Sequence, residues 1–142
     1  MSLIQALLII HLFSIAMVLG VGFSNLVGFR LARKLGGEKA MGIAAHREAL
    51  IRYVDIFVVL VLASGLTMLW AIGGAQGLPI WFHIKMGAVA IWVVAYILMR
   101  LRIRNFLVSR DMSLLRLIGA YAHVAITAAV LALIFAVLTF GP

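Results

Sequence analysis

His83 and Lys85, an imidazole and an ammonium two residues apart, are the residues of this sequence that most strongly indicate chemistry. Lys85 is the only charge in residues 80–99, a run that is otherwise apolar and long enough to cross a bilayer as a helix. Ionisable side chains inside such a helix are costly, and their presence therefore favours a functional role. We take this stretch as the starting point for a candidate site.

The helix face below His83 carries little side-chain bulk. Gly87 and Ala90 follow the histidine by four and seven residues, which puts them on the same face. A histidine above such a smooth surface suits a flat macrocycle such as haem, whose iron takes imidazole as an axial ligand. The alternative is a histidine at the membrane interface, a lysine that reaches toward water, and small residues that only permit close helix packing. We favour the first interpretation because other histidines support it.

The composition indicates that the whole chain lies in a membrane. Of the 142 residues, 66% are hydrophobic, well above the ~45–50% apolar usage of soluble domains. Predominantly apolar runs predict membrane-spanning helices at about residues 3–29, 44–72, 79–100 and 115–140. The predicted fold class is all-α, a transmembrane four-helix bundle that forms a single integral membrane domain. Cysteine is absent, which excludes disulfides and thiolate metal sites.

The positions of the cations predict the orientation. A net charge of +8 would suggest nucleic acid in a soluble protein, but eleven of the twelve Lys and Arg residues lie in two segments, 30–52 and 100–116. The positive-inside rule puts both segments on the cytoplasmic side, and both termini with the 73–79 turn on the outer side. We therefore expect a multi-pass protein of the inner (cytoplasmic) membrane, with lipids and not nucleic acid around it.

This orientation sorts the histidines by depth. His11 is expected about 12 Å from the outer end of the first helix, and His83 about 5 Å from the outer end of the third. Helix tilt can close this gap, so the two imidazoles are predicted to ligate the iron of haem b from two helices. Lys85 would then offer its charge to a haem propionate. His46 is expected at the level of the lipid headgroups and not as a ligand.

The inner half of the bundle allows more than one interpretation. His123 lies among small residues of the fourth run and is predicted either to ligate a second haem or to hydrogen-bond to Asp55 or Ser64. The cofactor is therefore haem b, as one group or two. Arg52 and Asp55, three residues apart, are predicted to form a structural ion pair. Zinc is disfavoured because no carboxylate accompanies the outer histidines, whereas copper, which also binds imidazole, stays open.

The chain resembles the HemJ type of small four-helix membrane proteins, which are cofactor-dependent protoporphyrinogen oxidases. His11 stands early in the first helix, and the stretch Trp81-Phe82-His83-Ile84-Lys85 matches the W-x-H-x-K motif that opens the third helix of that family. Residues 64–70 are also similar to the end of its second helix. The resemblance implies haem b at His11 and His83, with Lys85 assisting. Copper-resistance (CopD-like) membrane domains have similar helices.

Three functions agree with these features. The first is a haem-b membrane oxidoreductase of the HemJ type, acting on a porphyrinogen or a quinone-like molecule. The second is a small transmembrane cytochrome b that carries electrons through one or two haems. The third is a CopD-like copper-binding protein. The sequence favours the first, and it leaves the substrate, the electron acceptor and the formation of a homo-oligomer open.

Overall fold

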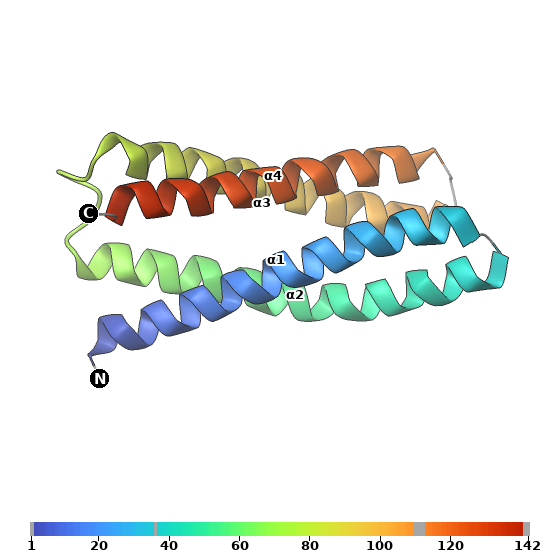
Figure 1. Ribbon diagram of the computed structural model, residues 1–142, viewed down its shortest axis with the longest axis horizontal. Helices are drawn as coiled ribbons and strands as arrows, with labels where there is room; N and C mark the ends of the chain where they lie inside the picture. The colour runs from blue at the N-terminus through green and yellow to red at the C-terminus, as the bar shows by residue number, and fades with distance from the viewer. Residues whose placement is uncertain (1, 36, 110–112, 141–142) are drawn as a thin grey trace. The chain divides into compact units, whose positions relative to one another are not determined.

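The computed structural model describes residues 2–35, 37–109 and 113–140. They form four helices and no strand: α1 (Leu3–Leu35), α2 (Gly37–Ala71), α3 (Ile80–Ser109) and α4 (Leu114–Phe140) (Figure 1). Each helix contains a segment long and apolar enough to cross a bilayer. The predicted all-α class with four membrane-spanning helices is therefore confirmed. Arg110, a cation of the second basic segment, lies outside the described residues.

The helices extend further at their basic ends than the apolar runs predicted. α1 continues to Leu35, α2 already begins at Gly37, and α3 continues to Ser109. Lys, Arg, Glu, Ala and Leu dominate these extensions, and all five are good helix formers. Hydropathy therefore locates the four helices but underestimates their length.

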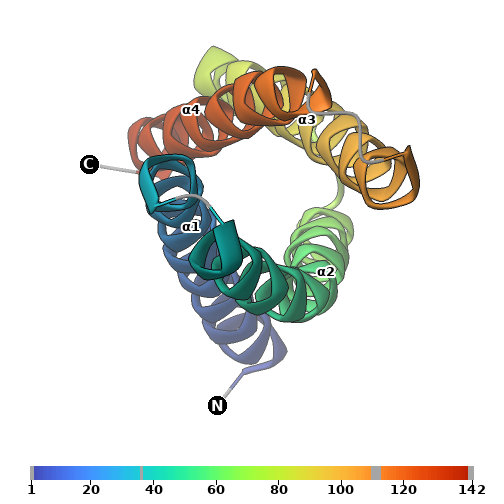
Figure 2. The same cartoon turned by 90° about the vertical axis from the view of Figure 1, so that its right-hand side faces the viewer.

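The chain divides between Gln76 and Gly77 into two compact units, and each unit is a hairpin of two helices. α1 packs against α2 in the first hairpin, and α3 packs against α4 in the second (Figure 2). That both belong to one domain stays a prediction.

The first hairpin has a single antiparallel register. His11 contacts Ser64, and Gly28 contacts Arg47, so the contacts are 17 residues apart on α1 (11 to 28) and on α2 (47 to 64). At the usual rise this is about 25 Å of continuous helix contact. β-branched residues form one buried face of α2 at a spacing of three and four: Ile51, Val54, Val58 and Val61.

Most of the buried side chains in the second hairpin are alanines. The buried alanines are Ala88 and Ala95 on α3 and Ala125, Ala128 and Ala132 on α4. Small side chains let helix backbones approach closely, which stabilises helix pairs inside a bilayer. At the end of α3 near the connecting turn, the rings of Trp81 and Phe135 stack with centroids 6.0 Å apart. The two hairpins therefore use different side chains for the same task.

Glycines end α2 and begin the connection to α3. Gly73 and Gly74 have φ angles of +87° and +96°, in the left-handed region that glycine adopts without penalty. The Gly73 N–H donates to the Trp70 carbonyl at 3.1 Å, and the Gly74 N–H donates to the Leu69 carbonyl at 2.9 Å. This is the Schellman pattern of a helix C-terminus. Pro79 directly precedes α3, and the predicted tight turn is present.

Candidate functional site

His11 is bound to the neighbouring helix of the first hairpin. Its Nδ1 atom lies 2.9 Å from Oγ of Ser64 on α2. The ring also lies against the backbone at Gly65, where an added Cβ would be 3.1 Å from Cε1 of the imidazole and 3.6 Å from Nδ1. The half-buried imidazole thus bonds to the Ser64 hydroxyl and occupies the space that the missing side chain of Gly65 leaves open.

Ser64 is itself constrained by its own helix. The side chain is buried, with 4% of its surface exposed. Its Oγ atom lies 2.5 Å from the Leu60 carbonyl oxygen and 3.2 Å from that of Val61. Hydroxyl groups of helical serines commonly donate to these preceding carbonyls. The position of Ser64 relative to His11 is therefore set by α2 and by the register of the hairpin.

A second buried serine lies on the same face of α1 as His11. Ser14 follows the histidine by three residues and is 0% exposed. Its Oγ atom has no hydrogen-bond partner among the described residues. A buried hydroxyl without a partner lowers the stability of its surroundings. Two buried hydroxyl groups, those of Ser14 on α1 and Ser64 on α2, thus belong to the part of the hairpin that holds His11.

The residues of the W-x-H-x-K motif occupy the first two turns of α3. His83 is exposed, and its ring meets that of Phe82 edge-on with centroids 5.8 Å apart. The half-buried Lys85 has its Nζ atom 5.8 Å from the centroid of the Phe82 ring, a cation–π distance. Trp81 packs on α4 through Phe135. The tryptophan therefore fixes the start of α3, and His83 projects from it.

The small-residue face below His83 is open. Gly87 and Ala90 are both exposed on α3. A Cβ added at Gly87 would meet no heavy atom of the described residues within 4 Å. The smooth face predicted from the spacing of these residues is thus present as a surface of the helix.

His123 bonds to its own helix. Its Nδ1 atom lies 2.7 Å from the carbonyl oxygen of Gly119, one turn earlier on α4. Because a carbonyl only accepts, Nδ1 carries the proton in this bond. The histidine is exposed. Ser64, one of the two partners predicted for His123, bonds to His11 instead.

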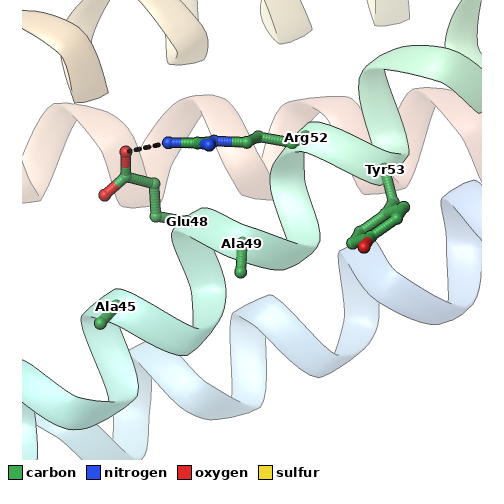
Figure 3. A pocket seen from close by; sticks show the side chains of 5 residues that line it. All are labelled: Ala45, Glu48, Ala49, Arg52 and Tyr53. Carbon is green, nitrogen blue, oxygen red and sulfur yellow. Dashed lines mark ion pairs between the residues drawn. The ribbon is translucent and has the colours of Figure 1, made fainter.

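Arg52 forms an ion pair with Glu48 at 3.6 Å. An acid four residues before a base is the favoured order of a helical ion pair. The pairing of Arg52 with Asp55 stays a prediction. Figure 3 shows the pair of Glu48 and Arg52 beside the shallow hollow that α2 forms. The hollow is lined by Ala45, Glu48, Ala49, Arg52 and Tyr53.

The basic end of the first hairpin contains a polar cluster that the sequence did not reveal. The Arg47 guanidinium lies over the Phe29 ring, 5.4 Å from its centroid. The aliphatic part of Arg47 passes Gly28, where an added Cβ would be 3.3 Å from its Cδ. Nε of Arg47 and Oδ1 of Asn25 are buried without a partner among the described residues. Nothing in the local spacing signals this cluster, because it depends on the register between two helices.

The described residues contain no group of three or more His, Asp or Glu side chains that could hold a metal ion. A zinc or copper site with three protein ligands is therefore not supported there. Haem iron is different, because the macrocycle supplies four ligands and the protein at most two. His11 of the first hairpin and His83 and His123 of the second are each suited to that task. That His11 and His83 share one iron stays a prediction.

A comparison of the chain with known protein families, curated proteins and solved structures gave no match. The resemblance to the HemJ type therefore stays a prediction that rests on His11 and the W-x-H-x-K motif. The geometry around the histidines provides the remaining support for a function.

Proposed function

We propose that this protein is an integral membrane oxidoreductase of the HemJ type that binds haem b through His11 and His83. The observation that carries the proposal is the placement of His11. Its imidazole lies within the candidate span Leu3–Ala32 and is hydrogen-bonded to the buried Ser64 of α2. A polar ring at such a depth is costly, and a fixed orientation is what an axial ligand requires.

The start of α3 offers a second imidazole and a helix surface without bulky side chains. His83 supplies an exposed imidazole, and Gly87 and Ala90 below it leave an open helix surface. A flat ring can lie on this surface without displacing a side chain. Lys85 offers a positive charge to a propionate, an anion that would otherwise be poorly solvated near the apolar layer. The donor set thus fits haem better than a bare metal ion.

Haem, when bound, supplies the one-electron redox chemistry, and a porphyrinogen or a quinol is the electron donor that fits an apolar site. The chain binds and orients. When haem is bound, His11 and His83 would ligate the iron, Lys85 would pair with one propionate, and the apolar helices would exclude water. Lipids would surround the four helices, and we place the protein in the inner membrane.

A second candidate is a small cytochrome b with two haems. The observation in its favour is the bond from His123 to Gly119, which leaves the neutral ring with its lone pair on Nε2. An exposed imidazole in that state on α4 can ligate an iron. A copper protein of the CopD type has no comparable support from the described residues.

Haem content tests the proposal. The protein is purified in detergent from haem-replete cells, and bound haem is measured as the pyridine haemochromogen per chain. A ratio near one and a b-type band are expected, together with rescue of a strain that lacks its own protoporphyrinogen oxidase. A ratio near two without rescue would instead support the cytochrome. A colourless preparation would reject both.

A further inference from the structure

We infer that Ser64 and Gly65 are positioning residues for His11. Ser64 selects the ring tautomer that carries its proton on Nδ1, and Gly65 provides the space in which this ring lies. Together they direct the lone pair of Nε2 toward the ligand of the site. The inference rests on the proposed function for the identity of that ligand, haem iron, but the tautomer itself is a property of the protein alone.

The single proton of the Ser64 hydroxyl decides the tautomer. The Oγ atom has two carbonyl oxygens within reach, that of Leu60 at 2.5 Å and that of Val61 at 3.2 Å. Carbonyl oxygens only accept, so the hydroxyl proton is directed at them. Toward His11, 2.9 Å away, Ser64 then presents only a lone pair. Nδ1 must therefore donate, and the neutral ring keeps its lone pair on Nε2.

This arrangement matches the usual environment of a metal-binding histidine. Such a ring almost always donates its other N–H to an oxygen acceptor, which fixes the ring orientation and raises the basicity of the ligating nitrogen. Here the acceptor is a hydroxyl that is itself hydrogen-bonded to a carbonyl, and bonds in such chains strengthen one another. Loss of this acceptor removes the bond that holds the proton on Nδ1.

Gly65 affects His11 through steric contact and not through a hydrogen bond. A Cβ at this position would lie 3.1 Å from Cε1 of His11, closer than about nine in ten real contacts of such an atom, so the ring would have to move by a few tenths of an ångström. Cε1 stands between the two ring nitrogens, so a push at this atom moves both of them. Alanine at residue 65 would therefore turn Nδ1 away from Ser64 and change the direction of Nε2. Gly20 is a matched control on α1, because a Cβ there meets none of the described heavy atoms within 4 Å.

A matched control for Ser64 lies one turn further along α2. The Thr67 hydroxyl donates to the Ala63 carbonyl at 2.8 Å, which is the same bond to the residue four positions earlier. Thr67 is exposed, and its hydroxyl bonds to its own helix and not to a histidine ring. Removing its hydroxyl changes the helix in the same way as removing that of Ser64, but leaves His11 with its acceptor.

The test is nitrogen NMR of the full chain, labelled with ¹⁵N-histidine and purified in detergent without haem. At a pH of about 8.5 the neutral form of imidazole dominates, and a protonated ring nitrogen resonates far from an unprotonated one. The His11 signal is identified by its loss in His11→Gln. We expect Nδ1 protonated in the wild type and in Thr67→Ala, and a shift of the proton to Nε2 in Ser64→Ala. Ser64→Thr should restore the wild-type state.

An Nε2-protonated His11 in the wild type would overturn the inference, and so would an unchanged tautomer in Ser64→Ala. The wild-type spectrum decides even if Ser64→Ala fails to fold. A role limited to holding α1 against α2 would not move the tautomer.

Haem binding is a separate measurement. Gly65→Ala should weaken haem binding by about 10-fold or more, the usual effect of disturbing a partner of a metal ligand. Gly20→Ala should bind as the wild type does. If the expected tautomer is found but no preparation binds haem, the positioning role stands and the proposed cofactor is wrong. Equal haem binding by both alanine variants would reject the role of Gly65.

Discussion

The two hairpins hold their histidines in opposite ways. In the first, His11 of α1 bonds to Ser64 of α2, so its orientation depends on the packing of two helices. In the second, His123 bonds to the carbonyl of Gly119 on its own helix, and His83 is exposed at the start of α3. A bond between helices makes the orientation of a ring sensitive to register. A bond within one helix makes it independent of its neighbours.

The contact surfaces between the paired helices also differ between the two hairpins. The first hairpin buries polar atoms, among them the hydroxyl of Ser14 and Nε of Arg47, and both lack a partner in the described part of the chain. The second hairpin is lined mainly by alanine. Substitutions that remove polar groups should therefore affect the first hairpin most. Substitutions that add volume should affect the second most.

The largest expected effect is the loss of an axial ligand, which compares the hairpins directly. His11→Ala and His83→Ala should each remove most of the bound haem, because alanine offers no electron pair to the iron. The loss should exceed the ~10–100-fold effect of removing only a hydrogen-bond partner of a ligand. His46→Ala is the control, since this histidine is exposed at the basic end of α2, and it should keep its haem. A normal spectrum in His83→Ala would contradict the ligand set.

The next largest effect concerns packing in the second hairpin. Ala128 is buried at 5% exposure, and leucine in its place should force the helices apart. Overpacking of this kind typically costs about 1–3 kcal/mol. Val130→Leu on the same helix is the control, because Val130 is 43% exposed. Denaturation in mixed detergent micelles, followed by circular dichroism, measures both. Equal stability of the two variants would mean that the alanine surface is not closely packed.

Lys85 should have a smaller effect than the two histidines proposed as haem ligands. Lys85→Met keeps a flexible apolar stem and removes the charge, so folding should persist while haem is retained several-fold less well or its midpoint potential shifts. Lys85→Arg keeps the charge, so its haem retention should lie between that of the wild type and that of Lys85→Met. A wild-type haem content and potential in Lys85→Met would make Lys85 an interfacial lysine without a role at the site.

The comparison also explains how much of the molecule could be predicted from the sequence. The four spans were predictable because hydropathy is a local property of about 20 residues. The open face at Gly87 and Ala90 was predictable from helical spacing within α3. The extensions to Leu35 and Ser109 were missed because Lys and Arg residues interrupt the apolar runs there, and these residues are good helix formers.

What could not be predicted depends on contact between helices. Ser64 meets His11 only because α1 and α2 pack in one particular register, and the same register brings Arg47 to Gly28. No spacing within one helix contains this information. The sequence allowed Ser64 a bond to His123 equally well. Such contacts across the first hairpin are where structure adds most to the candidate site.

The smallest expected effect belongs to an interaction within one helix. Glu48 and Arg52 pair at 3.6 Å on α2, with side chains that are 42% and 77% exposed. Exposed pairs of this spacing contribute about 0.3–0.5 kcal/mol, because water screens the charges and long side chains lose freedom when they pair. Glu48→Gln should therefore lower the free energy of unfolding by no more than this and leave haem content unchanged.

Ser64→Ala is the comparison for Glu48→Gln, since it removes a contact that joins α1 to α2 and is expected to be the more destabilising. Both are measured by the same detergent denaturation. If Glu48→Gln were instead the more harmful, the contact between the helices would not be what stabilises the first hairpin. The hollow formed by Ala45, Ala49 and Tyr53 beside this ion pair would then be the surface to examine for a bound lipid or a partner helix.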